Sequence, residues 1–212
     1  MDGHADDETL ERLKAWWKTY GNALLLGIAL GLAILFGHKY WSQYKQERAE
    51  TASAIYEELL EHYRQKEFDA VREASGKLID DYASTPYAGL AAMIVARIDL
   101  EGDKREAGRE QLRWAMEHAT DGATRHVARL RLARVLADAN EIDPALALLD
   151  IDDTAGFELD YYELRGDLHE TKGNKQAARN AYQQALKHVD DRSSYRPILN
   201  MKLDDLGPSE SE

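Results

Sequence analysis

The residues that could carry out chemistry do not assemble into a complete catalytic motif. His169 and Glu170 begin an HExxH-like segment, but glycine stands at position 173, where a zinc protease needs its second histidine. The sequence contains no cysteine, which excludes disulfides, thiol nucleophiles and thiolate metal sites. It also contains no GxxxxGK or GxGxxG phosphate loop and no GxSxG serine motif. We therefore expect no enzymatic activity, no cofactor and no metal.

The other titratable side chains do not suggest a catalytic pair. The seven histidines are scattered, and of these His118 and His126 lie near each other, where a surface role is the simpler interpretation. Adjacent carboxylates occur at predicted helix ends or turns, namely Asp152 with Asp153, Asp190 with Asp191 and Asp204 with Asp205. Because neighbouring side chains on a helix do not face each other, these pairs are better explained as caps and solvated charges than as an acid and a base.

The overall charge argues against nucleic acid as a partner. The chain has 39 acidic and 27 basic residues, which gives a formal net charge of -12. A surface of this sign repels phosphate backbones. We therefore expect no nucleic-acid binding.

The most apolar segment lies near the N-terminus. Residues 23–37 carry no charge, and the 21 residues from Tyr20 to Tyr40 would extend about 31 Å as a helix. This length matches a bilayer core of roughly 30 Å. Aromatic residues, which prefer the headgroup regions, flank the segment on both sides: Trp16, Trp17 and Tyr20 before it, and Tyr40, Trp41 and Tyr44 after it. The sequence therefore predicts one transmembrane helix over residues 19–41, with the lipid bilayer as a partner.

Two alternatives to this anchor, a cleaved signal peptide and a buried core helix, remain open. No small-x-small cleavage site follows the apolar run, and aromatic residues at both ends do not suit an amphipathic core helix. Three basic residues precede the span and three follow it, so the charges alone do not orient it. Gly27 and Gly31 form a GxxxG pair, which predicts close contact with another membrane helix, although glycine is common in such helices.

From Ser42 onward the patterns favour helices over strands. Runs rich in Ala, Leu, Glu and Arg alternate with short turn signals, as helix hairpins require. Thr85 before Pro86 and Asp143 before Pro144 predict helix starts. We expect four helix pairs and then a capping helix, over about residues 47–82, 86–119, 122–152, 158–189 and 194–206.

A recurring offset supports a repeat architecture. Gly173 precedes Ala178 by five residues, and the same offset separates Gly102 from Ala107 and Asn140 from Ala145. The three alanines are 38 and 33 residues apart, a period typical of tetratricopeptide repeats.

Two further residues belong to the last of these units. Small residues at Gly166 and Ala178 would allow two helices to cross closely, with Tyr182 filling the layer. We therefore predict an all-α fold, a single N-terminal transmembrane helix followed by a tetratricopeptide-like α-solenoid. An ordinary antiparallel bundle is the alternative, because Gln111 stands in this alignment where Tyr182 stands.

Together, the anchor and the repeats resemble the YfgM family, the tetratricopeptide ancillary subunit of the bacterial Sec translocon. The matching features are an acidic N-terminal tail, Trp16-Trp17, the end of the span at residues 38–41, and the segments 129–135, 164–167 and 172–179. The resemblance covers nearly the whole chain. The anchor and the last segment together are its most specific part.

The resemblance implies a topology and a set of partners. Residues 1–18 would form a cytoplasmic tail, 19–41 the anchor in the inner membrane and 42–206 a periplasmic repeat domain, and we expect a disordered tail over 207–212. The implied function is that of an adaptor or chaperone-like subunit. Its implied partners are the SecYEG translocon, a periplasmic foldase of the PpiD type and the proteins that emerge from the channel. The alternative is a generic membrane-anchored scaffold for another cell-envelope assembly.

The repeat register also predicts a binding surface. In such arrays the first helix of each pair lines a concave face, which can bind a partner. With the register of Gly166 and Gly173, that face consists of Ile55, Leu59 and His62; Ala92, Ala96 and Asp99; Leu130, Arg134 and Ala137; and Glu163, Asp167 and Glu170. The groove would be apolar at one end and acidic at the other, where a basic segment could bind. The alternative is that Ile55, Leu59 and Leu130 belong to the core.

Overall fold

The computed structural model describes residues 3–154 and 156–207, except for the side chains of residues 3–9, 11–13, 19, 23, 24 and 26–29. The described residues are almost entirely helical and contain no strand. They divide into two compact units, one up to Glu50 and the other from Thr51 onward. The long helix α1 (Gly3–Gln65) supplies the whole helical part of the first unit and the first helix of the second.

The first unit is a single stretch of helix with exposed apolar side chains. Leu30, Leu35 and Phe36 are each more than 60% exposed. Among the described residues, no helix meets the combined length and hydropathy needed for a membrane span. The predicted transmembrane helix over residues 19–41 includes several residues outside the described side chains, Gly27 among them, and it stays a prediction. A Cβ added at Gly31 would meet nothing within 4 Å in the described structure.

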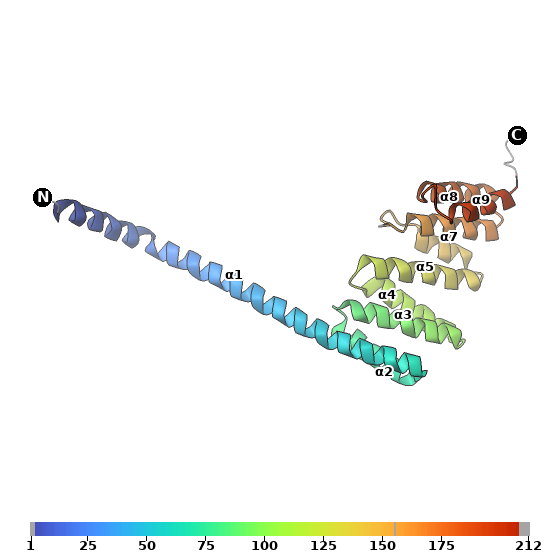
Figure 1. Ribbon diagram of the computed structural model, residues 1–212, viewed down its shortest axis with the longest axis horizontal. Coiled ribbons are helices and arrows are strands. Elements are labelled where there is room, and N and C mark those ends of the chain that lie inside the picture. The colour runs from blue at the N-terminus through green and yellow to red at the C-terminus, as the bar shows by residue number, and fades with distance from the viewer. Residues whose placement is uncertain (1–2, 155, 208–212) are drawn as a thin grey trace. The chain divides into compact units, whose positions relative to one another are not determined.

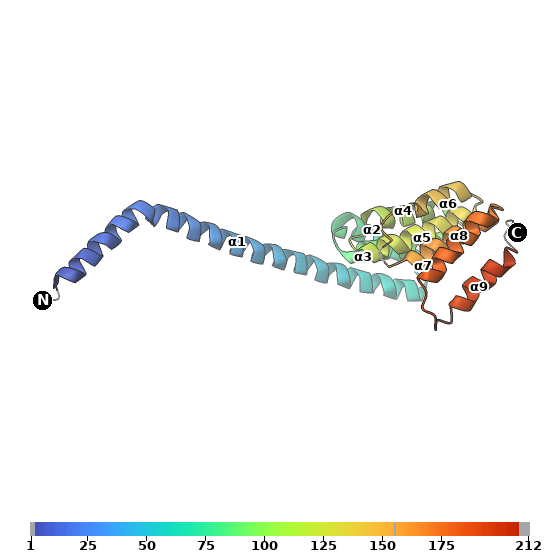
Figure 2. The same cartoon turned by 90° about the horizontal axis from the view of Figure 1, so that it is seen from above.

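The second unit is a stack of antiparallel helix pairs that follow one another in chain order (Figure 1). The end of α1 pairs with α2 (Phe68–Tyr82). The next pairs are α3 (Pro86–Glu101) with α4 (Arg105–His118), α5 (Gly122–Asp138) with α6 (Ile142–Leu149), and α7 (Glu158–Thr171) with α8 (Lys175–Lys187). The last helix, α9 (Arg196–Asp205), packs on α8 and closes the C-terminal end of the stack (Figure 2). This arrangement confirms the tetratricopeptide-like solenoid.

Each pair turns through the same backbone motif. A residue with positive φ stands between the two helices in every pair: Lys66, Asp103, Asn140 and Gly173, with φ between 60° and 78°. In all four turns the next residue donates its N–H to a carbonyl five residues back, as Asn174 does to His169 at 2.8 Å. The left-handed residue itself donates to a carbonyl three residues back, as Gly173 does to Glu170 at 2.8 Å. These two bonds form a Schellman motif, which satisfies carbonyls left free at the helix end.

These turns correct the repeat alignment in the second pair. Gly102 is not the left-handed residue, since its φ is -88°; Asp103 takes that conformation, with φ of 60°. Aspartate tolerates the left-handed region better than most residues, so a glycine nearby is no guide to the turn. The residue five positions after the turn is therefore Gly108, not Ala107, and the repeats are 37, 37 and 33 residues long.

The predicted helix starts are confirmed in one case and wrong in the other. α3 begins at Pro86, although the hydroxyl of Thr85 donates to the carbonyl of Tyr82 at 2.8 Å and does not cap the helix. α6 begins at Ile142, so Asp143 lies inside its first turn. The Asp143 carboxylate is instead engaged by Lys172 from the next pair.

The core runs between the helix pairs as two main clusters. One joins α1, α2 and α3 through residues such as Leu59, Val71 and Leu78, which are fully buried. The other joins α3 to α7 through residues such as Leu132 and Leu149. Because each layer rests on the next, the elements that carry the concave face are held in place by their neighbours.

Candidate partner-binding surface

The structure places most of the apolar residues predicted for the concave face inside the core. Leu59 and Ala92 are fully buried, and Ile55 and Leu130 are 8% and 3% exposed. Ala96 is 1% exposed but contributes to the floor of a groove described below. These residues therefore contribute mainly to packing, which is the alternative left open by the sequence.

Two polar residues from the same prediction have structural partners. The Asp99 carboxylate is buried and accepts hydrogen bonds from the Arg72 guanidinium, with an Nη2–Oδ1 distance of 2.7 Å, so it ties α2 to α3. The Nδ1 atom of His62 lies 2.6 Å from a Glu67 carboxylate oxygen. This hydrogen bond raises the pKa of His62 above its usual value. Both side chains are therefore engaged by other residues of the chain.

On α1 and α3, the first helices of the first two pairs, the residues that line a groove lie one position after the predicted ones. In the register of the observed turns, the residues equivalent to Glu163, Asp167 and Glu170 are Tyr56, Leu60 and Tyr63 on α1, and Met93, Arg97 and Leu100 on α3. All six line one hollow of about 550 Å³, together with Arg134 of α5. We call this hollow the concave groove. Its remaining lining residues are Leu90, Ile94, Ala96, Glu101, Leu112, Arg131 and Val135.

The floor of the concave groove is apolar and its edge is basic. Tyr56 and Tyr63 are half-buried, and burial raises the pKa of Tyr56. Three arginines and one glutamate line the groove. Glu101 pairs with Arg97, with an Nε–Oε1 distance of 2.7 Å. Arg131 and Arg134 are exposed, and within the described residues no ion pair or hydrogen bond engages either side chain.

The acidic residues predicted at the far end are engaged by the chain itself. Lys202 of α9 places its ammonium 2.7 Å from Glu163 Oε1 and 2.6 Å from Asp167 Oδ1. Tyr195 donates its hydroxyl to Glu163, and Tyr182 donates its hydroxyl to Asp167 at 2.7 Å.

These contacts change the titration of the groups that make them. Burial, together with the hydrogen bond to Glu163, raises the pKa of Tyr195 to about 12. The pKa of Tyr182 is raised by burial and by its bonds to Asp167 and Glu170. Desolvation lowers the pKa of Lys202, but the hydrogen bonds to Asp167 and Glu163 and the charges of these carboxylates together raise it above its usual value. The acidic cluster thus binds the C-terminal helix, and it is not an empty site for a basic ligand.

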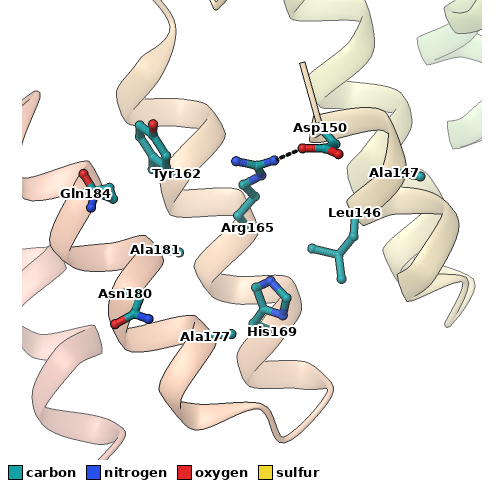
Figure 3. Close-up of a pocket in the computed structure, with 10 residues that line it drawn as sticks. All are labelled: Leu146, Ala147, Asp150, Tyr162, Arg165, His169, Ala177, Asn180, Ala181 and Gln184. Carbon is teal, nitrogen blue, oxygen red and sulfur yellow. Dashed lines mark hydrogen bonds and ion pairs between the residues drawn. The ribbon is translucent and has the colours of Figure 1, made fainter. Parts of the chain in front are cut away.

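A second hollow of about 450 Å³ lies between α6, α7 and α8 (Figure 3). It is more polar, and the Arg165 guanidinium reaches across to Asp150 at 2.7 Å. The His169 ring also lines it; its Nδ1 atom is buried and has no hydrogen-bond partner among the described residues. Burial lowers the pKa of His169, and the charges of Arg165 and Lys172 lower it further. Within the described residues no three His, Cys, Asp or Glu side chains are placed to hold a metal ion.

Sequence reasoning missed most of the groove residues because of the turn alignment. Six lining residues on α1 and α3 lay one position away from those predicted, whereas the position of Arg134 on α5 was correct. One signal could have located the groove. A large residue follows three of the four left-handed residues by nine positions, namely Tyr182, Leu149 and Leu112. This spacing holds in the second pair only when Asp103 is the turn residue.

Comparison with known proteins places this architecture in a family. The family model of a tetratricopeptide repeat-like domain matches residues 14–208. The chain is 31% identical to the ancillary SecYEG translocon subunit of Aggregatibacter actinomycetemcomitans, over 95% of this chain and 97% of that protein. It is 28% identical to proteins of the same name from Haemophilus influenzae and Escherichia coli, over 95% of this chain and 97% and 96% of those proteins.

Proposed function

Because this chain belongs to the tetratricopeptide repeat-like family of the ancillary SecYEG translocon subunits, we propose that it is a non-catalytic adaptor of the Sec translocon. The observation that carries the proposal is the 31% identity across nearly the full length of both chains. A match of this extent includes the N-terminal segment as well as the repeats. The stacked helix pairs and the open concave groove support a role in binding other proteins.

The finer parts of the proposal concern topology. We propose that residues 19–41 anchor the chain in the inner membrane, with residues 1–18 in the cytoplasm and the repeat domain over 42–206 in the periplasm. The uncharged run over residues 23–37 and the aromatic residues on both sides of it support the anchor. The direction of the anchor rests on the resemblance to the family, since the flanking charges are balanced.

The proposed partners extend beyond the translocon. The repeat domain would bring a periplasmic foldase of the PpiD type close to proteins that emerge from the channel and would assist their handling. Exposed apolar surface in the concave groove supports such a role, because surfaces of this kind usually mark sites of protein contact.

Copurification tests the adaptor role directly. The tagged full chain is extracted in mild detergent, and the bound proteins are identified by mass spectrometry. We expect SecYEG and a PpiD-type foldase among them. Recovery of a different envelope assembly without SecYEG would favour the alternative, a scaffold that serves another machinery.

Glycine substitutions separate a packed anchor from a simple tether. Gly27→Leu with Gly31→Leu adds bulk where a GxxxG face would approach another helix, so we expect weaker recovery of SecYEG. Gly37→Leu is the control, since Gly37 lies in the same apolar segment but outside the GxxxG pair. Equal recovery of SecYEG with the double variant and the control would show that the two glycines reflect only the usual amino-acid composition of membrane helices.

A further inference from the structure

We propose that the concave groove binds a polypeptide segment that carries both apolar and acidic side chains. The inference rests on the proposed function, in that it takes the chain to be a protein-binding adaptor. It adds the chemical class of the ligand, and it reverses the charge that the sequence pattern indicated for the ligand of this face.

Apolar side chains form the floor of the concave groove. Tyr56, Leu60, Met93 and Leu100 are only half-buried, although they line a hollow flanked by the hydrophobic core. A volume of about 550 Å³ lies within the range of sites that enclose several ligand groups. Large apolar side chains of a partner would remove this surface from water, which is the usual driving force for association.

The charged residues that line the concave groove are mostly basic. The chain carries a net charge of -12, yet the concave groove is lined by three arginines and a single glutamate. Glu101 is engaged by Arg97. Arg131 and Arg134 stand three residues apart on α5, so they face the same side of the helix.

These two arginines differ from others in the second unit. Arg72, Arg165 and Arg196 each reach a carboxylate within 3.3 Å, whereas Arg131 and Arg134 meet none among the described residues. Arg113 and Arg192 likewise meet no carboxylate among the described residues, so it is the position of Arg131 and Arg134 beside an apolar groove that fits the carboxylates of a bound segment.

The chain's own acidic cluster does not compete for these arginines. Glu163 and Asp167 are held by Lys202, and Asp167 and Glu170 accept hydrogen bonds from Tyr182. A basic segment would have to displace Lys202 from both carboxylates before it could bind there. The open part of the face therefore selects acidic ligands.

Fluorescence anisotropy with the full chain in detergent micelles tests the charge preference. The probe is a fluorescein-labelled peptide of alternating Leu, Asp and Phe, and its counterparts have Lys or Asn in place of every Asp. We expect the Asp peptide to bind at least about tenfold more tightly than the Lys peptide, with an affinity that falls as salt is added. Equal or tighter binding of the Lys or Asn peptide overturns the proposal.

Arginine variants locate the site. Arg131→Glu with Arg134→Glu should abolish the preference for the Asp peptide. Arg113→Glu with Arg192→Glu, which changes two exposed arginines outside the groove, should retain it. Should circular dichroism show that the first pair of changes lowers helix content, Arg131→Gln with Arg134→Gln replaces it. A folded groove variant that binds the Asp peptide as tightly as the unaltered chain overturns the proposal.

Two parallel measurements separate this inference from its premise. If SecYEG copurifies with the chain but the Asp peptide is not preferred, the inference is wrong and the adaptor function is still supported. If the Asp peptide is preferred through the groove but SecYEG does not copurify, the ligand preference is supported and the translocon adaptor function is wrong. Light scattering tests whether a second copy of the chain occupies the groove. If the unaltered chain self-associates and the groove variant is monomeric, the ligand is a second copy, and the proposal of a segment from another protein is wrong.

Discussion

At the scale of single residues, each helix pair combines a small side chain at one position with a larger side chain at another. One lies seven residues before the left-handed turn residue and the other nine residues after it. A Cβ added at Gly166 would lie 2.2 Å from the Tyr182 ring, so the two positions meet in the last pair. From the last pair to the first, the residues at these positions are Gly166 and Tyr182, Ala133 and Leu149, Ala96 and Leu112, and Leu59 and Ser75. A small residue on one side goes with a large one on the other, as dense packing requires.

A minimal substitution tests this close contact. Gly166→Ala should destabilise the chain by at least about 1–3 kcal/mol, because the Tyr182 ring is tied to Asp167 and Glu170 and cannot move aside. Chemical denaturation of the full chain measures the free energy of unfolding. The matched control is Gly76→Ala in α2, where the added Cβ meets nothing within 4 Å. Because alanine has the higher helix propensity, this change should stabilise the chain by about 0.5–1 kcal/mol. Equal effects at both sites would contradict the packing described for Gly166.

His169 gives the fold a dependence on pH. Its pKa is lowered in the folded chain, so folding favours the neutral ring. The contribution of the neutral ring to the free energy of unfolding is complete above the pKa of His169 in the unfolded chain, about 6.5, and it is lost as pH falls below that pKa. Between about pH 7.5 and about pH 5.5, the unaltered chain should therefore lose more thermal stability than the His169→Asn variant.

The opposite shift at His62 supplies the control for that prediction. Its pKa is raised, so its contribution is present below about 6.5 and is lost as pH rises. His62→Asn should make the loss of stability on acidification steeper, while His169→Asn makes it shallower. Identical pH profiles for the two variants would contradict the assigned environments.

At the scale of elements, α9 is held by both apolar and charged contacts. Leu199 and Leu206 are buried, and Leu206 packs with Ala178 and Tyr182 of α8. Lys202 adds its bonds to Glu163 and Asp167 of α7. The last pair of a solenoid would otherwise expose an apolar face, so the helix completes the stack.

Removal of the Lys202 charge should loosen this helix selectively. Lys202→Met leaves two carboxylates without their cation at a site that is only partly buried, at a cost of about 1–2 kcal/mol. Hydrogen exchange should speed up in α9 and remain unchanged in α3 to α5. Lys202→Arg, which keeps the charge, should restore slow exchange. No change in α9 for the Met variant would show that the apolar contacts alone retain the helix.

At the scale of the whole molecule, the proposed function makes a prediction about topology. Protease added to intact spheroplasts should digest residues 45–212 and leave a membrane-protected N-terminal fragment, because the repeat domain is proposed to face the periplasm. Immunoblotting with tags at either end measures which part survives. A repeat domain that is cut only after lysis would contradict the proposed orientation.

The sequence by itself determined the local features of the chain. Alternating helix formers and turn residues are properties of short segments, and the predicted helix pairs correspond to those observed. The period in the middle thirties and the capping helix near residues 194–206 were likewise visible without a structure. The anchor over residues 19–41 and its orientation stay predictions.

The tertiary structure decided which face of each helix is open. An alignment error of one residue rotates a helix by about 100°, enough to exchange a core position such as Leu59 for a groove position such as Leu60. It also decided the charge of the groove. Lys202 meets Glu163 across 39 residues of sequence, a contact that no local pattern predicts, while Arg131 and Arg134 remain open to solvent. Local propensity specifies helices, but long-range packing and pairing specify which of their side chains a partner can reach.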